Sequence, residues 1–310
     1  MAFAVVYSRA LVGVTALQVQ VEVHLANGLP QCNLVGLPDK EVRESRERVR
    51  AALANCGFKF PARRITVNLA PADLPKQSSR FDLPIALGIL AASGQIEGRH
   101  LGDHEFAGEL ALSGELRPVQ GVLPMAVAVA RSGRAFVLPH RCASEGGLAS
   151  GAIILPANHL QEVCQHLSGK QLIMPLAPAA PGVAPSYPDM VDVLGQRRAK
   201  RGLEIAAAGG HHVLMVGPPG TGKSMLAARF PGICPEMGEV EAMEAAAIHS
   251  AYSEGFAPEQ WRCRPFRHPH HSITAAALAG GGLLSRPGEV SLAHGGTLHL
   301  DEMASFQYCQ

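Results

Sequence analysis

The stretch Val213-Leu-Met-Val-Gly-Pro-Pro-Gly-Thr-Gly-Lys-Ser224 decides the fold of the second half of this 310-residue chain. Its first four residues form an apolar run, which predicts a short buried strand. The remaining eight match the pattern Gly-x-x-x-x-Gly-Lys-Ser of a phosphate-binding loop, with a helix expected from Lys223. Glycines let the backbone wrap around a phosphate, and the first N–H groups of the helix point at it. The residues expected to hold a nucleotide are Gly217, Pro218, Pro219, Gly220, Thr221, Gly222, Lys223 and Ser224.

A second segment, Thr297-Leu-His-Leu-Asp-Glu302, predicts the strand that carries the acidic half of the same site. Lys223 is expected to reach the β- and γ-phosphates, while Ser224 and Asp301 hold Mg²⁺. Glu302 is expected to orient and activate the attacking water. The predicted cofactors are therefore ATP and Mg²⁺, with Lys223 and Glu302 as the catalytic residues.

The composition is that of an ordinary globular protein, with 47% hydrophobic and 17% charged residues. The formal net charge is only +1, so a contact with nucleic acid must come from local basic patches. No apolar run reaches the ~18 residues that indicate a membrane span, and the N-terminus lacks a basic leader. The seven cysteines contain no Cys-x-x-Cys pair, which favours reduced thiols and a cytoplasmic location.

The first part of the chain, residues 1–172, predicts an α/β domain. Strict alternation of apolar and polar residues over 17–25 predicts a half-exposed strand. A helix is expected from Asp39 to Cys56, with a solvated charged face on which Glu44 and Arg48 can pair. Further strands are expected near 64–69, 135–138 and 152–155, helices near 82–93 and 122–132, and a strand and turn over 107–118.

The domain boundary is expected at a segment rich in proline and alanine. Five prolines occur between Pro175 and Pro188, which is typical of a stiff, extended linker. We therefore predict a linker over residues 173–189 and a nucleotide-binding domain over residues 190–310, in which a helix over 197–208 precedes the phosphate-binding loop.

Two other groups of residues could carry chemistry. The histidines of His268-Pro-His-His271 could bind a metal, although zinc sites usually take ligands in separated pairs. Two groups of basic residues could contact phosphates of nucleotide or DNA, or could be ordinary surface charge. These are Arg262, Arg264 and Arg267 beside the histidines, and Arg197, Arg198, Lys200 and Arg201 earlier in the chain.

Several separated motifs in this chain resemble one family. They are Asp192-Val-Leu-Gly-Gln196, Glu204-Ile-Ala-Ala-Ala-Gly-Gly-His-His212, the phosphate-binding loop, Arg264-Pro-Phe-Arg-His-Pro-His-His271 and Pro287-Gly-Glu-Val-Ser-Leu-Ala-His294. In this order they resemble the magnesium chelatase-like AAA+ ATPases, in particular the bacterial ComM (YifB) family, and the resemblance runs from residue 1 to about 305. It implies a cytoplasmic protein that forms hexameric rings and performs ATP-driven work on DNA, namely branch migration during transformation, with no membrane partner and no small-molecule substrate except ATP.

The N-terminal part resembles the proteolytic domain of Lon, of the ribosomal protein S5 domain 2-like class. The resemblance is carried by Gly108-Glu-Leu-Ala-Leu-Ser-Gly-Glu-Leu-Arg-Pro-Val-Gln-Gly121. Lon uses a Ser–Lys dyad, but this chain has no serine in register near Arg80-Phe81-Asp82. It has Val122, Leu123 and Pro124 where the lysine would lie, and Lys76, Ser78 and Ser79 belong to a predicted turn and helix start. We therefore expect no peptidase activity.

The end of the sequence bears on what this chain can do. Only eight residues follow Glu302. The resembled AAA+ sheet has strand order 5-1-4-3-2, so strand 4, the sensor residues, the arginine finger and the helical lid would follow residue 310. The tail Ser305–Gln310 predicts a truncated or frameshifted chain, or a fragment, with a partial AAA+ domain. Three functions stay open: an ATP-driven DNA remodeller, a chelatase-type motor on a protein or tetrapyrrole complex, and a non-catalytic nucleotide-binding fragment.

Overall fold

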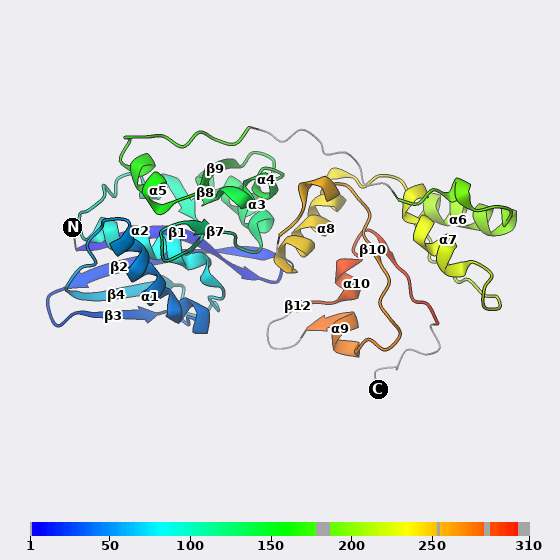
Figure 1. Cartoon of the computed structure of the whole chain (residues 1–310), viewed down its shortest axis with the longest axis horizontal. Coiled ribbons are helices and arrows are strands. Elements are labelled where there is room, and N and C mark those ends of the chain that lie inside the picture. Colours follow the sequence, from blue (N-terminus) through cyan, green and yellow to red (C-terminus); the bar gives the residue numbers. More distant parts are fainter. Residues whose placement is uncertain (1, 178–186, 253–254, 282–285, 303–310) are drawn as a thin grey trace. The chain divides into compact units, whose positions relative to one another are not determined.

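The computed structural model describes residues 2–177, 187–252, 255–281 and 286–302. Its contacts divide the chain into two units, one of Met1–Ala180 with Ser253–Phe256 and one of Pro181–Tyr252 with Ala257–Gln310. The middle of the predicted linker and the tail Ser305–Gln310 lie outside the described residues. Both units combine strands with helices, so the predicted mixed α/β fold class is confirmed (Figure 1).

The first unit is built on a seven-stranded mixed sheet with the order β3-β4-β2-β1-β5-β8-β9. The pairs of β2 with β1 and β4 are antiparallel, and the other four pairs are parallel. The strands are β1 (Phe3–Val12), β2 (Thr15–Ala26), β3 (Gln31–Val35), β4 (Arg64–Ala70), β5 (His104–Phe106), β8 (Ala135–Pro139) and β9 (Ile153–Ala157); β6 (Glu109–Leu110) and β7 (Leu116–Arg117) form a separate antiparallel pair. The helices are α1 (Lys40–Asn55), α2 (Asp82–Ala92), α3 (Val122–Ser132), α4 (Ala143–Gly146) and α5 (Leu160–Leu167).

The alternation that predicted a half-exposed strand is confirmed in β2. Val19, Val21, Val23 and Leu25 are buried, while the residues between them are partly or fully exposed. The whole apolar helix α2 packs against β1 and β2 (Figure 1). Contact is close enough that a Cβ on Gly88 would lie 2.6 Å from Val23, so only glycine fits there. This packing forms the main core of the first unit.

Helix α1 forms where its cap predicted, but one of its charges is used differently. The side chain of Asp39 accepts a hydrogen bond from Val42 N at 2.9 Å, which satisfies a free N–H of the first turn. Arg48 does not pair with Glu44, as the spacing had suggested. It donates to the fully buried carboxylate of Asp82 at 2.7 and 3.0 Å. A buried carboxylate without a charged partner costs more free energy than the exposed carboxylate of Glu44 does, so Arg48 pairs with Asp82.

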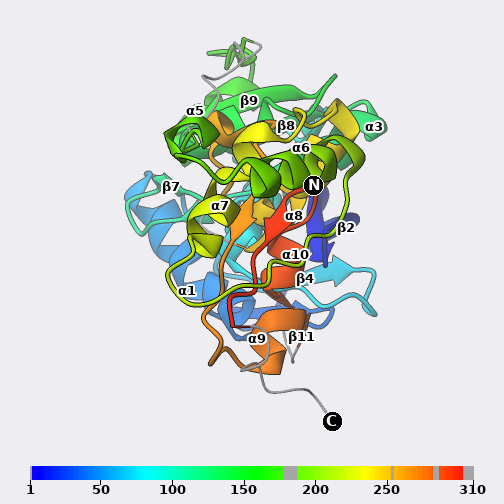
Figure 2. The same cartoon turned by 90° about the vertical axis from the view of Figure 1, so that its right-hand side faces the viewer.

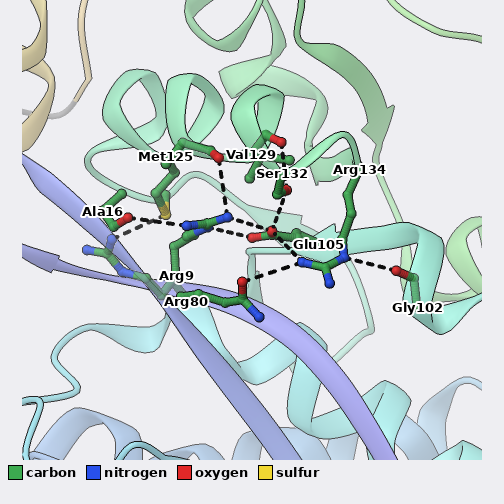
Figure 3. Close-up of polar contacts among 11 residues, drawn as sticks. Arg9, Ala16, Arg80, Gly102, Glu105, Met125, Val129, Ser132 and Arg134 are labelled. Atoms are coloured by element: carbon green, nitrogen blue, oxygen red, sulfur yellow. Dashed lines mark hydrogen bonds and ion pairs between the residues drawn. The ribbon is translucent and has the colours of Figure 1, made fainter.

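A buried ion cluster ties β1 to β5 and α3. Glu105 is fully buried and accepts a bidentate pair of hydrogen bonds from Arg9 at 2.6 and 2.7 Å (Figure 3). Arg134 approaches the same carboxylate at 3.2 Å, and the hydroxyl of Ser132 donates to it at 2.9 Å. Charge-assisted bonds of this kind offset the cost of removing the carboxylate from water.

The second unit consists of shorter elements. The helices are α6 (Arg197–Gly209), α7 (Lys223–Arg229), α8 (Glu239–Tyr252), α9 (Ala275–Ala279) and α10 (Glu289–Leu292). The strands are β10 (Phe266–Arg267), β11 (Gly280–Gly281), β12 (Arg286–Pro287) and β13 (Thr297–Leu298). β10 pairs with β13 in parallel, and β11 pairs with β12 in antiparallel fashion, with β11 beside α9 (Figure 2). Among the described helices, none is both long and apolar enough to cross a membrane.

The strand predicted over Val213–Val216 is wrong for this structure. The segment has no regular secondary structure and pairs with no strand among the described residues. Met215 packs beside the small core of Val193, Leu203 and Leu226, whereas Leu214 is 79% exposed and Val216 is 88% exposed. An apolar run becomes a buried strand only when neighbouring strands bond to its two edges, and the described residues supply no such neighbour.

Candidate nucleotide-binding site

The phosphate-binding loop has the backbone that its glycines predict. Gly220 and Gly222 have φ values of +79° and +86°, in the left-handed region that glycine adopts without strain. Gly222 caps α7, which begins at Lys223 as predicted. The loop therefore presents the N–H groups at the start of α7 together with those of the preceding turn, which is the arrangement that binds phosphate.

Side chains within the loop hold it in shape. Lys223 Nζ donates to the carbonyls of Gly217 at 2.9 Å and Pro218 at 3.1 Å, so the ammonium lies over the loop. Thr221 Oγ1 donates to the same Pro218 carbonyl at 2.9 Å. Gln196, just before α6, donates to the carbonyl of Thr221 at 2.9 Å. These bonds stabilise the shape of the loop and keep the ammonium of Lys223 beside its backbone.

The two halves of the predicted site meet in the structure. Ser224 Oγ donates to Asp301 Oδ2 at 2.7 Å, although the residues are 77 positions apart. The bond from Ser224, together with the N–H of Glu302 and the nearby histidines, lowers the pKa of Asp301 below its usual value. A hydroxyl and an ionised carboxylate in contact are oxygen donors that Mg²⁺ prefers, so these residues fit the predicted metal.

Glu302 follows Asp301 but points elsewhere. Its carboxylate is mainly exposed and lies 3.8 Å from Nδ1 of His271. Its φ of +52° is uncommon for a residue with a side chain, which marks a strained backbone at the end of the acidic segment. The carboxylate of Glu302 therefore lies beside the ring of His271, while its backbone N–H donates to Asp301 Oδ1 at 3.0 Å.

A pocket of about 670 Å³ opens beside the phosphate-binding loop. Part of its wall comes from α6, with Ala199, Leu203 and Ala206, and part from the segment just before the loop. Lys223 and Thr221 also line it, so the pocket is continuous with the loop. A mostly apolar hollow of this size next to a phosphate loop suits a flat aromatic base. The sequence had not indicated this pocket, because its shape depends on how α6 folds against the segment that follows it.

The basic residues that the sequence singled out divide into two groups. Arg264 bonds to Glu241 at 2.8 Å, and Arg267 forms a bidentate pair with Glu289 at 2.6 and 2.7 Å, so both serve the packing of the second unit. By contrast, Arg197 and Arg198 at the start of α6 are exposed. Arg201 is also exposed and pairs with Glu204 within the same helix at 2.9 Å.

The histidines of residues 268–271 do not act as one cluster. His270 lies against the Ser272 hydroxyl at 2.8 Å, and His271 lies toward Glu302. His268 instead faces His299, with ring centroids 4.7 Å apart. Burial and the nearby His268 lower the pKa of His299 below its usual value. The metal site that the sequence left open for these histidines is therefore not supported as a site of residues 268–271 alone.

The residues near the Lon-like position have other partners. Arg80 is buried, and its Nη1 lies 3.5 Å from the sulfur of Met125 in α3 (Figure 3). The hydroxyl of Ser79 donates to Glu109, and Ser78 Oγ accepts from the Arg80 N–H at 3.4 Å. The buried Lys76 donates to the carbonyl of Pro71. In the described residues, neither serine is hydrogen-bonded to a lysine that could serve as its base.

Comparison with known proteins agrees with the motifs. The model described as "Subunit ChlI of Mg-chelatase" matches residues 21–142, and the one described as "Magnesium chelatase, subunit ChlI" matches residues 189–309. The chain is 48% identical over 307 residues to the uncharacterized protein YifB of Escherichia coli and 50% identical over 313 residues to the competence protein ComM of Haemophilus influenzae. The chain belongs to the YifB/ComM family of magnesium chelatase-like proteins.

The relatives are longer than this member of the YifB/ComM family. Each alignment covers 99% of the chain but only 61% of the relative. A more distant relative, the uncharacterized protein Rv2897c of Mycobacterium tuberculosis, is 42% identical over 308 residues and is covered to the same 61%. Any activity of the full-length relatives is therefore only a proposal for this chain.

Proposed function

We propose that this chain binds Mg-ATP in its second unit and forms the nucleotide-binding part of an ATP-driven motor that remodels DNA. The observation that carries the ATP part is the contact of Ser224 with Asp301 beside the phosphate-binding loop. Two distant motifs that are each expected to hold the same ion lie within one hydrogen bond of each other. If the loop were only a glycine-rich turn with no ligand, nothing would require Ser224 and Asp301 to lie in contact.

The residues present divide the work as follows. The loop N–H groups and Lys223 would hold the phosphates, and Ser224 with Asp301 would hold Mg²⁺, which neutralises charge that develops on the phosphates. Glu302 would orient the attacking water once its contact with His271 is released. The pocket beside α6 would take the adenine, since its apolar wall is continuous with the loop.

DNA is the proposed partner because of the exposed basic start of α6 and the printed name of one relative. Arg197 and Arg198 are exposed there, and Lys200 and Arg201 follow within the same helix. The ComM relative is named a competence protein, and this connects the family with DNA uptake. Assembly into a ring of several copies is part of the same proposal, because motors of this class act as rings.

A second candidate function is a motor that acts on a protein or tetrapyrrole complex. The descriptions of both matching family models name a subunit of magnesium chelatase, and this favours it. Stimulation of ATP turnover separates the two functions. A DNA-remodelling motor should hydrolyse ATP faster when DNA is added, whereas a chelatase-type motor should do so when a porphyrin-binding partner is added. A chain that binds ATP but turns none over with either partner would favour a nucleotide-binding fragment.

The decisive experiment for ATP is a titration of a fluorescent ATP analogue with and without Mg²⁺. Lys223→Ala is expected to weaken binding by at least about 30-fold, because a charged phosphate contact contributes roughly 2–5 kcal/mol. Lys170→Ala is the matched control, since Lys170 is exposed at the end of the first unit. Equal affinity of the Lys223→Ala variant and the wild type would reject the site. For DNA, a triple change of Arg197, Arg198 and Arg201 to Ala is expected to weaken binding and reduce its dependence on salt.

A further inference from the structure

Three side chains of metal-ligand type, His268, His299 and Asp301, lie together just beyond the ends of β10 and β13. In the parallel pair, Phe266 lies opposite Thr297 and Arg267 opposite Leu298, and the N–H of His299 donates to the Arg267 carbonyl at 2.8 Å. The next position on each strand is a histidine. Neighbours at the same level of a parallel pair point to the same side, which places the ring of His268 beside that of His299.

Asp301 joins these two histidines from the turn that follows β13, two residues beyond His299. The three side chains offer one ligand atom each, and these atoms all lie within 4.8 Å of one another. A tetrahedral zinc ion with bonds of about 2.0–2.1 Å holds its donors roughly 3.4 Å apart. His268 is exposed, so its ring can rotate and bring its ligand nitrogen from within 4.8 Å to the donor spacing that zinc needs, without a movement of either strand.

An unsatisfied atom in this cluster points to a missing partner. Nε2 of His299 is buried and has no hydrogen-bond partner within the described part of the chain. Buried ring nitrogens in proteins are normally paired, since leaving one unpaired costs free energy. The ring of Phe266 stacks on that of His299, with 6.3 Å between the centroids, and this contact restricts the orientation of the His299 ring. A metal ion bound by His268 and Asp301 would give Nε2 its partner.

From this geometry we propose that His268, His299 and Asp301 bind a zinc ion or a similar borderline divalent metal. Imidazole nitrogens suit Zn²⁺, whereas Mg²⁺ prefers oxygen donors in octahedral geometry. The site is therefore distinct in its chemistry from the Mg²⁺ position of Ser224 and Asp301. Three protein ligands leave a fourth coordination position open to solvent or to another ligand.

The two positions share Asp301, so their occupancies are linked. Zinc at the histidines takes up the carboxylate that Ser224 now contacts at 2.7 Å. Zinc and Mg-ATP should therefore each weaken the binding of the other, by the same factor. This linkage rests on the proposed function, whereas the zinc site itself does not.

Metal titration of the full chain tests the site. Co²⁺, which replaces Zn²⁺ and absorbs visible light when four-coordinate, is added to the metal-free protein and then displaced with Zn²⁺. The variants are His299→Phe, which keeps an aromatic ring against Phe266, and His268→Ala, which changes an exposed side chain. Each is expected to weaken Zn²⁺ binding by at least about tenfold. Zinc should raise the midpoint of thermal unfolding of the wild type but not of either variant.

Two control variants make the outcome specific. His270→Ala changes a histidine outside the cluster and should leave zinc affinity unchanged. Lys223→Ala should also keep zinc binding while losing ATP, so failure of the nucleotide site and failure of the zinc site give different results. The proposal is overturned if both histidine variants bind zinc as well as the wild type does, if His270→Ala loses binding, or if the cobalt spectrum shows sulfur-to-metal charge transfer from a cysteine.

Discussion

Ser224 donates a hydrogen bond to Asp301 at 2.7 Å, which joins the first residues of α7 to the chain that follows β13. Ser224 is placed by the glycine turn that begins α7, and Asp301 by the pairing of β13 with β10. A hydroxyl that bonds an ionised carboxylate is already arranged around the position of a divalent ion.

The first prediction concerns this pair. Asp301→Asn keeps the shape of the side chain but removes its charge. It should leave the affinity for an ATP analogue in EDTA nearly unchanged while abolishing most of the gain from Mg²⁺, because the charge is needed only for the ion. Affinity is measured by fluorescence titration at several Mg²⁺ concentrations. An undiminished Mg²⁺ effect in the variant would show that Asp301 does not hold the ion.

The sequence predicted the residues of the loop because the chemistry is local. Backbone turns at Gly220 and Gly222 and the helix start at Lys223 all follow from neighbouring residues. The Asp39 cap and the alternation in β2 are local in the same sense. Each of these patterns occurs within a single segment, so it could be read from the sequence before the structure.

The features that the sequence missed depend on distant segments. Arg48 bonds to Asp82 in the next helix because burial of that carboxylate outweighs the weak helical pair with Glu44. Pairing of His268 with His299 depends on a strand register that spans 31 residues and has no local signal. The Val213–Val216 run looked like a strand by composition, yet strand formation needs partners that the run itself cannot specify.

The second prediction concerns the buried ion cluster of the first unit. Glu105→Gln should destabilise this unit by about 3–5 kcal/mol, since it leaves Arg9 and Arg134 without their anion in a buried site. Glu97→Gln is the control, because its pair with Arg99 is exposed. Unfolding in urea is followed by far-UV circular dichroism. The single tryptophan, Trp261, lies in the second unit. Its fluorescence therefore reports the unfolding of the second unit, which can then be distinguished from the unfolding of the first unit in the circular dichroism data.

The third prediction is a pH dependence of the second unit. The bidentate bonds from Arg267 lower the pKa of Glu289. Its stabilising contribution is therefore fully present above the unfolded pKa of about 4.3 and is lost as pH falls through the lower folded value. Glu289→Gln should cost about 1–2 kcal/mol at pH 7, and the difference from wild type should shrink in acid. Urea unfolding followed by Trp261 fluorescence measures it. A difference that stays constant down to pH 3 would contradict the assignment.

The fourth prediction concerns peptide hydrolysis by the first unit. Ser79 donates to Glu109, and Lys76 donates to a backbone carbonyl, so neither is arranged as a nucleophile and base. We expect no cleavage of casein or of fluorogenic peptides, and no change in Ser78→Ala or Ser79→Ala. Hydrolysis in the wild type that either variant removes would show that a serine of this turn is active.

The last prediction concerns the segment that leads into the phosphate-binding loop. Leu214 and Val216 are 79% and 88% exposed, and the backbone N–H groups of Val213–Val216 make no backbone hydrogen bond to another described residue. Exposed chain without such bonds can adapt readily to a protease cleft. Brief chymotrypsin treatment should therefore cut this chain after Leu214 or Met215 before it cuts α2 or β2, and mass spectrometry identifies the site. Mg-ATP should slow the cut by holding the adjoining loop, and Lys223→Ala should abolish that protection while keeping the cut itself. Resistance at this segment in the absence of nucleotide would show that another part of the protein covers it.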